Sequence, residues 1–294
     1  MIEQLTPNIP DYELLDTGSG EKLERFGAYV VRRPEPQAIW RKSLDEAVWR
    51  SADASFLRDQ KSDERGEWRL KPQMPSRWNV GFEYKQMHLK MRLALTSFKH
   101  VGIFPEQAAN WAYIYDSVEA LRSEGIERPK VLNLFAYTGG ATLAACAAGA
   151  ETTHIDSVKQ VVSWARENME QSQLDGVRWI VEDAMKFVER EVRRGNRYHG
   201  IILDPPAYGR GANGEKWVLE HDICPMLECC AKLLEPKRAF LVLNLYSMGL
   251  SSMLARTAVH QAFGDPRVEQ MGELYFADRS KKEIPFGTYY RFRR

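Results

Sequence analysis

Cysteine is scarce in this sequence, with 4 cysteines in 294 residues. Cys146, Cys224, Cys229 and Cys230 form no C-x-x-C pair and no Cys/His spacing suited to zinc. So few thiols in so long a chain exclude a disulfide-stapled secreted scaffold. We therefore predict a reducing compartment, the cytoplasm, and no metal site.

The chain also lacks an excess of charge of either sign. Its 41 basic and 40 acidic side chains leave a formal charge of +1, which excludes a polycation that holds nucleic acid by bulk charge. A local basic patch stays possible. With 44% hydrophobic and 28% charged residues, the composition is that of a globular protein. At ~100–200 residues per domain, the length predicts one large domain or two smaller ones.

No apolar leader opens the sequence, because its first 15 residues contain acids and prolines. One long uncharged run does occur, over residues 131–150. Its length alone suits a membrane span, but Gly139 and Gly140 interrupt it. A half rich in strand formers precedes the glycines and an alanine-rich half follows. We interpret the run as a buried strand, a tight turn and a buried helix, and predict no membrane segment.

Strand-like and helix-like segments alternate along the C-terminal two-thirds of the chain. The expected strands are 131–137, 152–156, 177–183, 198–204 and 238–246, and the expected helices are 140–149, 158–173, 184–194, 217–233 and 250–263. This alternation predicts an α/β fold with a mostly parallel sheet covered on both faces. Two final strand-like runs, 268–278 and 287–294, lack a helix between them, so we expect an antiparallel C-terminal hairpin at the sheet edge.

The first hundred residues follow a different pattern, with short alternating runs separated by turns. They predict a smaller, β-rich N-terminal accessory or substrate domain over 1–100, and a larger domain over 101–294. A helix over about 107–124 leads into the first strand of the large sheet.

Polar and glycine residues end four successive strands of the predicted sheet. They are the segment 133–140, Asp156, the pair Glu182-Asp183, and the run Asp204-Pro205-Pro206-Ala207-Tyr208. Ligands bind at the carboxyl ends of the strands in such sheets. Each signal has a purely structural alternative: a glycine turn, an aspartate N-cap or a proline turn. The P-loop, the G-x-G-x-x-G fingerprint and the G-x-S-x-G elbow are all absent.

Together these strand ends resemble the motifs of class I S-adenosylmethionine-dependent methyltransferases. VLNLFAYTGGATLAA resembles their first motif, THIDSVKQVVSWARENM the second, VEDAMKFV the third and LDPPAYGRG the fourth. The resemblance is closest to a bacterial branch that includes the large-subunit ribosomal RNA cytosine-5 methyltransferases. GIFPEQAANW (102–111) is similar to that branch's G-F-F-L-D-Q-R segment, with Ala108 in place of the arginine. A Rossmann-like class I fold and S-adenosyl-L-methionine as cofactor are implied.

The resemblance also implies roles for individual residues. Asp156 would accept the ribose hydroxyls, Asp183 the adenine amino group, and Phe104 and Gln107 would close over the cofactor. The full set implied for cofactor binding is Phe104, Gln107, Phe135, Ala136, Tyr137, Thr138, Gly139, Asp156, Ser157, Asp183 and Ala184. The set implied to face the methyl acceptor is Asp204, Pro205, Pro206 and Tyr208.

A base in ribosomal or similar RNA is the implied substrate. The cytosine-5 reaction needs a thiolate that adds to carbon six. This chain has no cysteine in 203–210 or in LNLYSMGL (243–250), where that branch carries one. The target atom therefore stays open. A small molecule or protein side chain as acceptor, or a module that binds without catalysis, are the alternatives. Oligomeric state is not indicated.

Basic and aromatic residues are interleaved in segment 68–100. Arg69, Lys71, Arg77, Lys85, Lys90, Arg92 and Lys99 accompany Trp68, Trp78, Phe82, Tyr84 and Phe98, with one acid, Glu83. Such a mixture suits phosphate contacts and base stacking. A solvated sheet face is the alternative.

Overall fold

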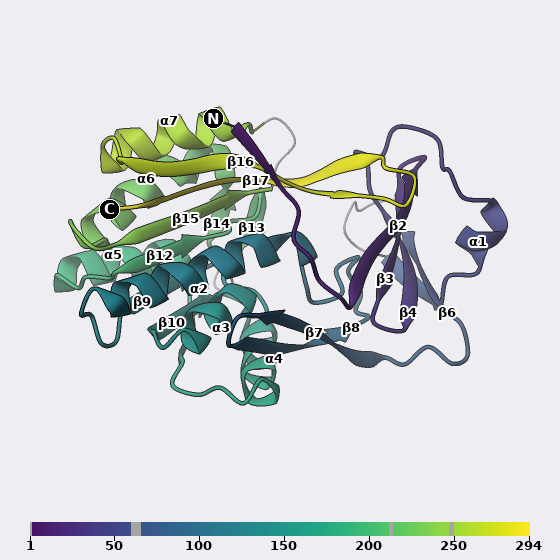
Figure 1. Cartoon of the computed structure of the whole chain (residues 1–294), viewed down its shortest axis with the longest axis horizontal. Helices are drawn as coiled ribbons and strands as arrows, with labels where there is room; N and C mark the ends of the chain where they lie inside the picture. Colours follow the sequence, from purple (N-terminus) through teal and green to yellow (C-terminus); the bar gives the residue numbers. More distant parts are fainter. Residues whose placement is uncertain (1, 60–65, 212–213, 247–249) are drawn as a thin grey trace.

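The computed structural model describes residues 2–59, 66–211, 214–246 and 250–294. Its large sheet and surrounding helices form one end of the molecule, and small β-sheets form the other (Figure 1). The long C-terminal hairpin runs from the large sheet to the small ones (Figure 1). There its turn contacts the N-terminal part, where Thr17 donates its hydroxyl hydrogen to Asp278 across 2.8 Å.

The large sheet has eight strands in the order β1-β16-β17-β15-β12-β9-β10-β11. Their bounds are β1 Ile2–Leu5, β9 Lys130–Leu134, β10 Glu151–Asp156, β11 Arg178–Val181, β12 Gly200–Leu203, β15 Phe240–Leu245, β16 Val268–Ala277 and β17 Glu283–Arg293. The five inner strands from β15 to β11 run parallel, while β17 is antiparallel to both of its neighbours. The predicted α/β class and the antiparallel C-terminal hairpin are confirmed.

The edge position predicted for that hairpin is wrong. Strand β1 pairs in parallel with β16 and forms the outer edge. Gly272 of β16 makes this possible, because a Cβ atom there would lie 1.6 Å from the Glu3 carbonyl oxygen. A four-residue strand is too short to show a periodic pattern, which is why the sequence did not indicate it.

Helices cover both faces of the large sheet. Their bounds are α2 Ala108–Ser123, α3 Gly140–Ala147, α4 Lys159–Gln171, α5 Ala184–Arg194, α6 Leu219–Leu233 and α7 Ser252–Phe263, with a 3-10 turn, η1, at Pro105–Gln107 before α2. One cluster of buried side chains joins α2 and α3 to the sheet, and a second joins α5, α6 and α7 to its other face.

No helix within the described ranges is both long and apolar enough to cross a membrane.

The N-terminal part contains a five-stranded sheet, a two-stranded hairpin and a short helix. The sheet is β2 Tyr12–Gly18, β3 Glu21–Phe26, β4 Tyr29–Pro34, β5 Ala54–Arg58 and β6 Gly66–Leu70; the hairpin is β7 Arg77–Tyr84 and β8 Met87–Ala94; and the helix is α1 Glu46–Arg50. Side chains of this part, such as Phe26 and Met91, belong to the same buried cluster as Ile114 of α2. A division at residue 100 therefore stays a prediction, with a core shared across it.

Hairpin β7–β8 buries some side chains of the basic and aromatic segment 68–100 and leaves others exposed. Trp78 and Phe82 are buried in the core, whereas Arg77 and Lys90 are exposed on the opposite side. Strand alternation separates the two kinds of side chain. The expectation that these two aromatic residues stack on bases is therefore wrong, and a basic face remains.

Candidate functional site

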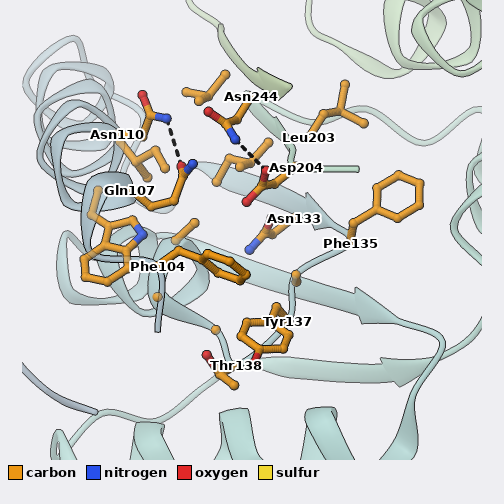
Figure 2. Close-up of a pocket in the computed structure, with 18 of the residues that line it drawn as sticks. Phe104, Gln107, Asn110, Asn133, Phe135, Tyr137, Thr138, Leu203, Asp204 and Asn244 are labelled. Atoms are coloured by element: carbon orange, nitrogen blue, oxygen red, sulfur yellow. Dashed lines mark hydrogen bonds between the residues drawn. The ribbon is translucent and has the colours of Figure 1, made fainter. Parts of the chain in front are cut away.

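A cavity of about 520 Å³ opens where the central strands of the large sheet end. It is lined by residues from the end of β9 and the loop after it, from the ends of β12 and β15, and from η1 and α2 (Figure 2). This volume includes open solvent at the mouth of the cavity, and a concave site of polar and aromatic residues at the strand ends suits a small-molecule ligand. The position is the one predicted from the strand ends.

The loop after β9 has an unusual backbone. Phe135, Tyr137 and Gly139 have φ values of 57°, 47° and 91°, so left-handed residues alternate with ordinary ones. Such alternation turns successive N–H groups toward one side, where they bind an anion. Asp156 takes one N–H group of this loop: its Oδ2 accepts the Tyr137 N–H across 3.0 Å, and its Oδ1 accepts the Val158 N–H, two residues further along its own segment, across 2.9 Å. The carboxylate thus fixes the loop that lines the cavity.

The two glycines of this loop serve packing. Gly139 takes the left-handed conformation and caps α3, and a Cβ atom on Gly140 would lie 2.3 Å from the Trp111 indole. The contact with Trp111, a residue that also lines the cavity, shows that Gly140 is needed first to let α2 pack on α3.

Asp204 is the acidic side chain among the described residues that line the cavity. Asn244, at the end of β15, donates from Nδ2 to Asp204 Oδ1 across 2.7 Å (Figure 2). Burial raises the pKa of Asp204 to about 6, and the bond from Asn244 opposes this rise. The Asn244 Oδ1 atom is buried without a hydrogen-bond partner in the described structure. The cavity therefore presents one carboxylate, held by the Asn244 amide.

Two amides face this pair from the other wall of the cavity. Asn110 Nδ2 donates to Gln107 Oε1 across 2.9 Å, and Arg291 donates to Asn110 Oδ1 across 3.3 Å (Figure 2). Phe104 lies beside them, with its ring centre 5.3 Å from that of Tyr137. The polar atoms are thus held in place by neighbouring side chains.

The structure brings part of the predicted site together. Eight predicted residues line the cavity: Phe104, Gln107, Phe135, Ala136, Tyr137, Thr138, Gly139 and Asp204. The Phe135 ring points away from Asp204 and packs 4.7 Å from Trp217 (Figure 2). The roles of all these residues toward a ligand stay predictions.

Seven predicted residues do not line this cavity: Asp156, Ser157, Asp183, Ala184, Pro205, Pro206 and Tyr208. Asp156 affects the cavity indirectly, by fixing the loop after β9 that lines it. Asp183 accepts the Lys186 N–H across 3.0 Å as the N-cap of α5, the structural alternative for this residue. Tyr208 is 50% exposed on the short strand β13, Tyr208–Arg210, which pairs with β14, Lys216–Val218.

Sequence reasoning missed several residues of the cavity, among them Asn110, Trp111 and Asn244. Asn244 lies in the segment 243–250 that was searched for a cysteine, and its position at a strand end was the available signal. Residues 247–249 of that segment, Ser247 included, lie outside the described residues. Asn110 and Trp111 lie on a helix, where strand-end reasoning does not reach.

The donor set does not suit a metal ion. No group of three or more His, Cys, Asp or Glu side chains that could hold one occurs in the described ranges. An acid, several amides and aromatic rings suit instead an organic cation with polar ends.

Comparison with known proteins agrees with this chemistry. Residues 41–274 match the family model for S-adenosylmethionine-dependent methyltransferases. The crystal structure of the S-adenosylmethionine-dependent methyltransferase from Agrobacterium tumefaciens is 38% identical with a TM-score of 0.89, covering 99% of this chain and 93% of that one. A methyltransferase whose structure was solved with S-adenosylhomocysteine bound has a TM-score of 0.69, and the match covers 97% of this chain and 76% of that one. Its sequence identity is 16%, so this likeness shows the fold alone.

Curated relatives are more distant. Ribosomal RNA large subunit methyltransferase K/L from Shewanella frigidimarina is 25% identical over 253 residues, which cover 80% of this chain. The protein of the same name from Methylococcus capsulatus is 36% identical over 110 residues, 36% of this chain and 15% of that relative. The matched region is only about a third, 34%, of the Shewanella protein's length. The residues matched by the family model include all those that line the cavity. The chain therefore belongs to the S-adenosylmethionine-dependent methyltransferase family.

Proposed function

We propose that this enzyme methylates a nitrogen atom of a base in RNA, with ribosomal RNA as the model substrate. The observation that carries the proposal is the Asp204 carboxylate, half-buried in the cavity wall at the end of β12 and held by Asn244. The names of the distant relatives support RNA as the acceptor. Exposed Arg77 and Lys90 on hairpin β7–β8 support it too, because cations on one face suit a phosphate backbone.

The chemistry asks little of the protein beyond alignment and exclusion of water. S-adenosylmethionine supplies a methyl group on a positively charged sulfur, which is reactive without further activation. Asp204 accepts a hydrogen bond from the base nitrogen and takes the proton that this nitrogen loses as its new bond to carbon forms. A carboxylate with a pKa of about 6 is largely ionised at pH 7 and is suited to that task.

Attack by carbon five of cytosine is disfavoured by the positions of the cysteines. Cys146 lies on α3 and the other three lie on α6, and none lines a cavity described here. Burial raises the pKa of Cys146 to about 11, so its thiol is protonated at neutral pH. A thiolate that could add to carbon six is therefore not at hand.

The remaining residue roles follow from the same proposal. Asp156, Ser157, Asp183 and Ala184 would contact the ribose and adenine of the cofactor as it lies over β10 and β11. Pro205, Pro206 and Tyr208 would approach the base from the β13 side. The N-terminal part, residues 1–100, would hold the RNA, and the enzyme would act in the cytoplasm.

The test is transfer of radiolabelled methyl groups to RNA from a strain that lacks the gene, followed by nucleoside mass spectrometry. We expect label in a single nitrogen-methylated nucleoside, and no label with Asp204→Ala. Label found only in protein or small molecules would refute RNA as the substrate. A methyl group on carbon five of a pyrimidine would refute the nitrogen.

A further inference from the structure

A second cavity, open to solvent, lies between the N-terminal sheet and the large sheet. Its walls come from β3 and β4, from the segment 99–106, and from β15 and β17 near Tyr246 and Phe286. It shares Ile103 and Phe104 with the first cavity. The Phe104 ring stands between them, 5.3 Å from Tyr137 of the first and 5.1 Å from His100 of the second.

The charges in this second cavity are already paired. Arg33 holds Glu24 with two bonds of 2.7 and 2.8 Å, and Lys22 lies 3.2 Å from Glu35. These two ion pairs satisfy four of the charged side chains in the walls, so those four offer little to a phosphate or to a metal ion. Lys99 also lines the cavity.

Glu106 adds a group that is not paired in this way. Its side chain is buried, with 4% of the residue exposed, and no hydrogen bond joins it to another side chain within the described ranges. Burial raises the pKa of Glu106 to about 8. At pH 7 the group is mainly a neutral carboxylic acid, which presents one donor and one acceptor side by side.

Aromatic rings complete the walls. Phe104, Tyr246 and Phe286 line the cavity together with the ring of His100. Flat rings combined with a donor–acceptor pair suit a planar, uncharged heterocycle, which can stack and pair by one edge. Nucleobases have such edges, and a base must leave its stack to reach a buried site.

We propose that the second cavity holds the flipped-out base during methyl transfer, with Glu106 pairing to its edge. This inference rests on the proposed function. The shared wall at Phe104 then places the base beside Asp204, whose charge interacts with Glu106. Glu106 is a binding residue in this arrangement, and Asp204 accepts the proton.

The test compares three variants of the full chain. Glu106→Leu removes the donor–acceptor pair, Glu106→Gln keeps both a donor and an acceptor, and Glu189→Gln on the exposed side of α5 is the matched control. We expect Glu106→Leu to raise the KM for RNA by about tenfold, the effect of one lost hydrogen bond, while the Kd for S-adenosylhomocysteine stays within about twofold. Glu106→Gln should stay within about threefold of wild type in KM, and the control should match wild type.

A second measurement does not depend on turnover of RNA. Ligand-observed NMR with adenosine, cytidine, guanosine and uridine, in the presence of S-adenosylhomocysteine, should detect binding of at least one nucleoside to wild type and its loss in Glu106→Leu. If RNA is methylated but Glu106→Leu keeps its KM, the inference is wrong while the proposed function stands. If no RNA is methylated but nucleoside binding depends on Glu106, the proposed substrate is wrong while the cavity is a base site. Wild type that binds no nucleoside overturns the inference.

Discussion

Asn244 Nδ2 donates to Asp204 Oδ1 across 2.7 Å and so joins the ends of two adjacent strands, β15 and β12. The Asn244 amide is oriented by this bond, because a carboxylate accepts and only the NH₂ group can donate to it. The consequence is that Asn244 Oδ1 faces the other way, buried and without a partner within the described structure. One asparagine thus holds the acid and has the orientation of its own amide fixed by it.

Replacing Asp204 tests its role in the reaction. Asp204→Asn keeps the shape and removes the proton acceptor, so we expect kcat to fall by about 100-fold or more. Binding of S-adenosylhomocysteine, measured by calorimetry, should stay within about threefold, because one neutral amide replaces one acid at the rim. An Asp204→Asn variant with near-normal kcat would show that Asp204 takes no proton.

The pH profile of wild type should report the same group. Burial raises the pKa of Asp204 to about 6, so the acceptor is protonated and inactive below that pH and ionised above it. We expect the methyl-transfer rate at saturating substrate to rise with pH and level off above about pH 7. A rate that stays constant from pH 5 to 8 would contradict this assignment.

Loss of Asn244 should move that profile. The hydrogen bond from Asn244 lowers the pKa of Asp204, against the effect of burial. In Asn244→Ala this opposition is lost, so the pKa rises and the acid limb of the pH–rate curve shifts to higher pH. Asn196→Ala, at an exposed position after α5, is the control and should leave the curve in place.

Asp156 is expected to act on cofactor affinity through the loop after β9. Its two oxygens accept the N–H groups of Tyr137 and Val158, and the carboxylate has further lone pairs for a ribose hydroxyl. Asp156→Asn should weaken S-adenosylmethionine binding by about 10- to 100-fold, as expected for one or two charged hydrogen bonds. Calorimetry measures this, with exposed Asp175→Asn as control. Equal affinities in the two variants would refute the role.

Gly140 should be essential for stability. A Cβ atom on Gly140 would lie 2.3 Å from the buried Trp111 ring, so Gly140→Ala should lower the free energy of unfolding by about 1 to 3 kcal/mol. In Gly209→Ala the nearest atom would lie at an ordinary 3.5 Å, so this variant should unfold like wild type. Scanning calorimetry compares their thermal midpoints.

Glu106 should reduce stability as the pH rises. Its pKa is about 8 in the folded protein against a model value of 4.5, so between these values the folded state binds the extra proton. Stability then falls with rising pH by up to about 1.4 kcal/mol per pH unit from this group. Glu106→Gln has no titratable group at this position. The difference in free energy of unfolding between this variant and wild type should therefore grow in favour of the variant from pH 5 to pH 8 in urea titrations. A constant difference would show that Glu106 is ionised when folded.

The strand ends illustrate what can be predicted from the sequence. The parallel strands are continuous apolar runs, so their ends are visible in the chain, and parallel pairing brings these ends to one edge. Asp204 and the loop 135–139 were found in this way. The second pattern, basic and aromatic residues in 68–100, was ambiguous, because alternation alone does not say which side faces the core.

By itself the sequence determined the α/β class, the methyltransferase motifs and most of the strand-end residues that line the cavity. These features depend on local periodicity and on residues close together in the chain. Only the tertiary structure decided that β1 forms the sheet edge, that Asn244 holds Asp204, and that Glu106 lies buried in a cavity between two sheets. Each of these depends on contacts between residues far apart in sequence. Burial and pairing there set the charge of a side chain, and neither is a property of the residue alone.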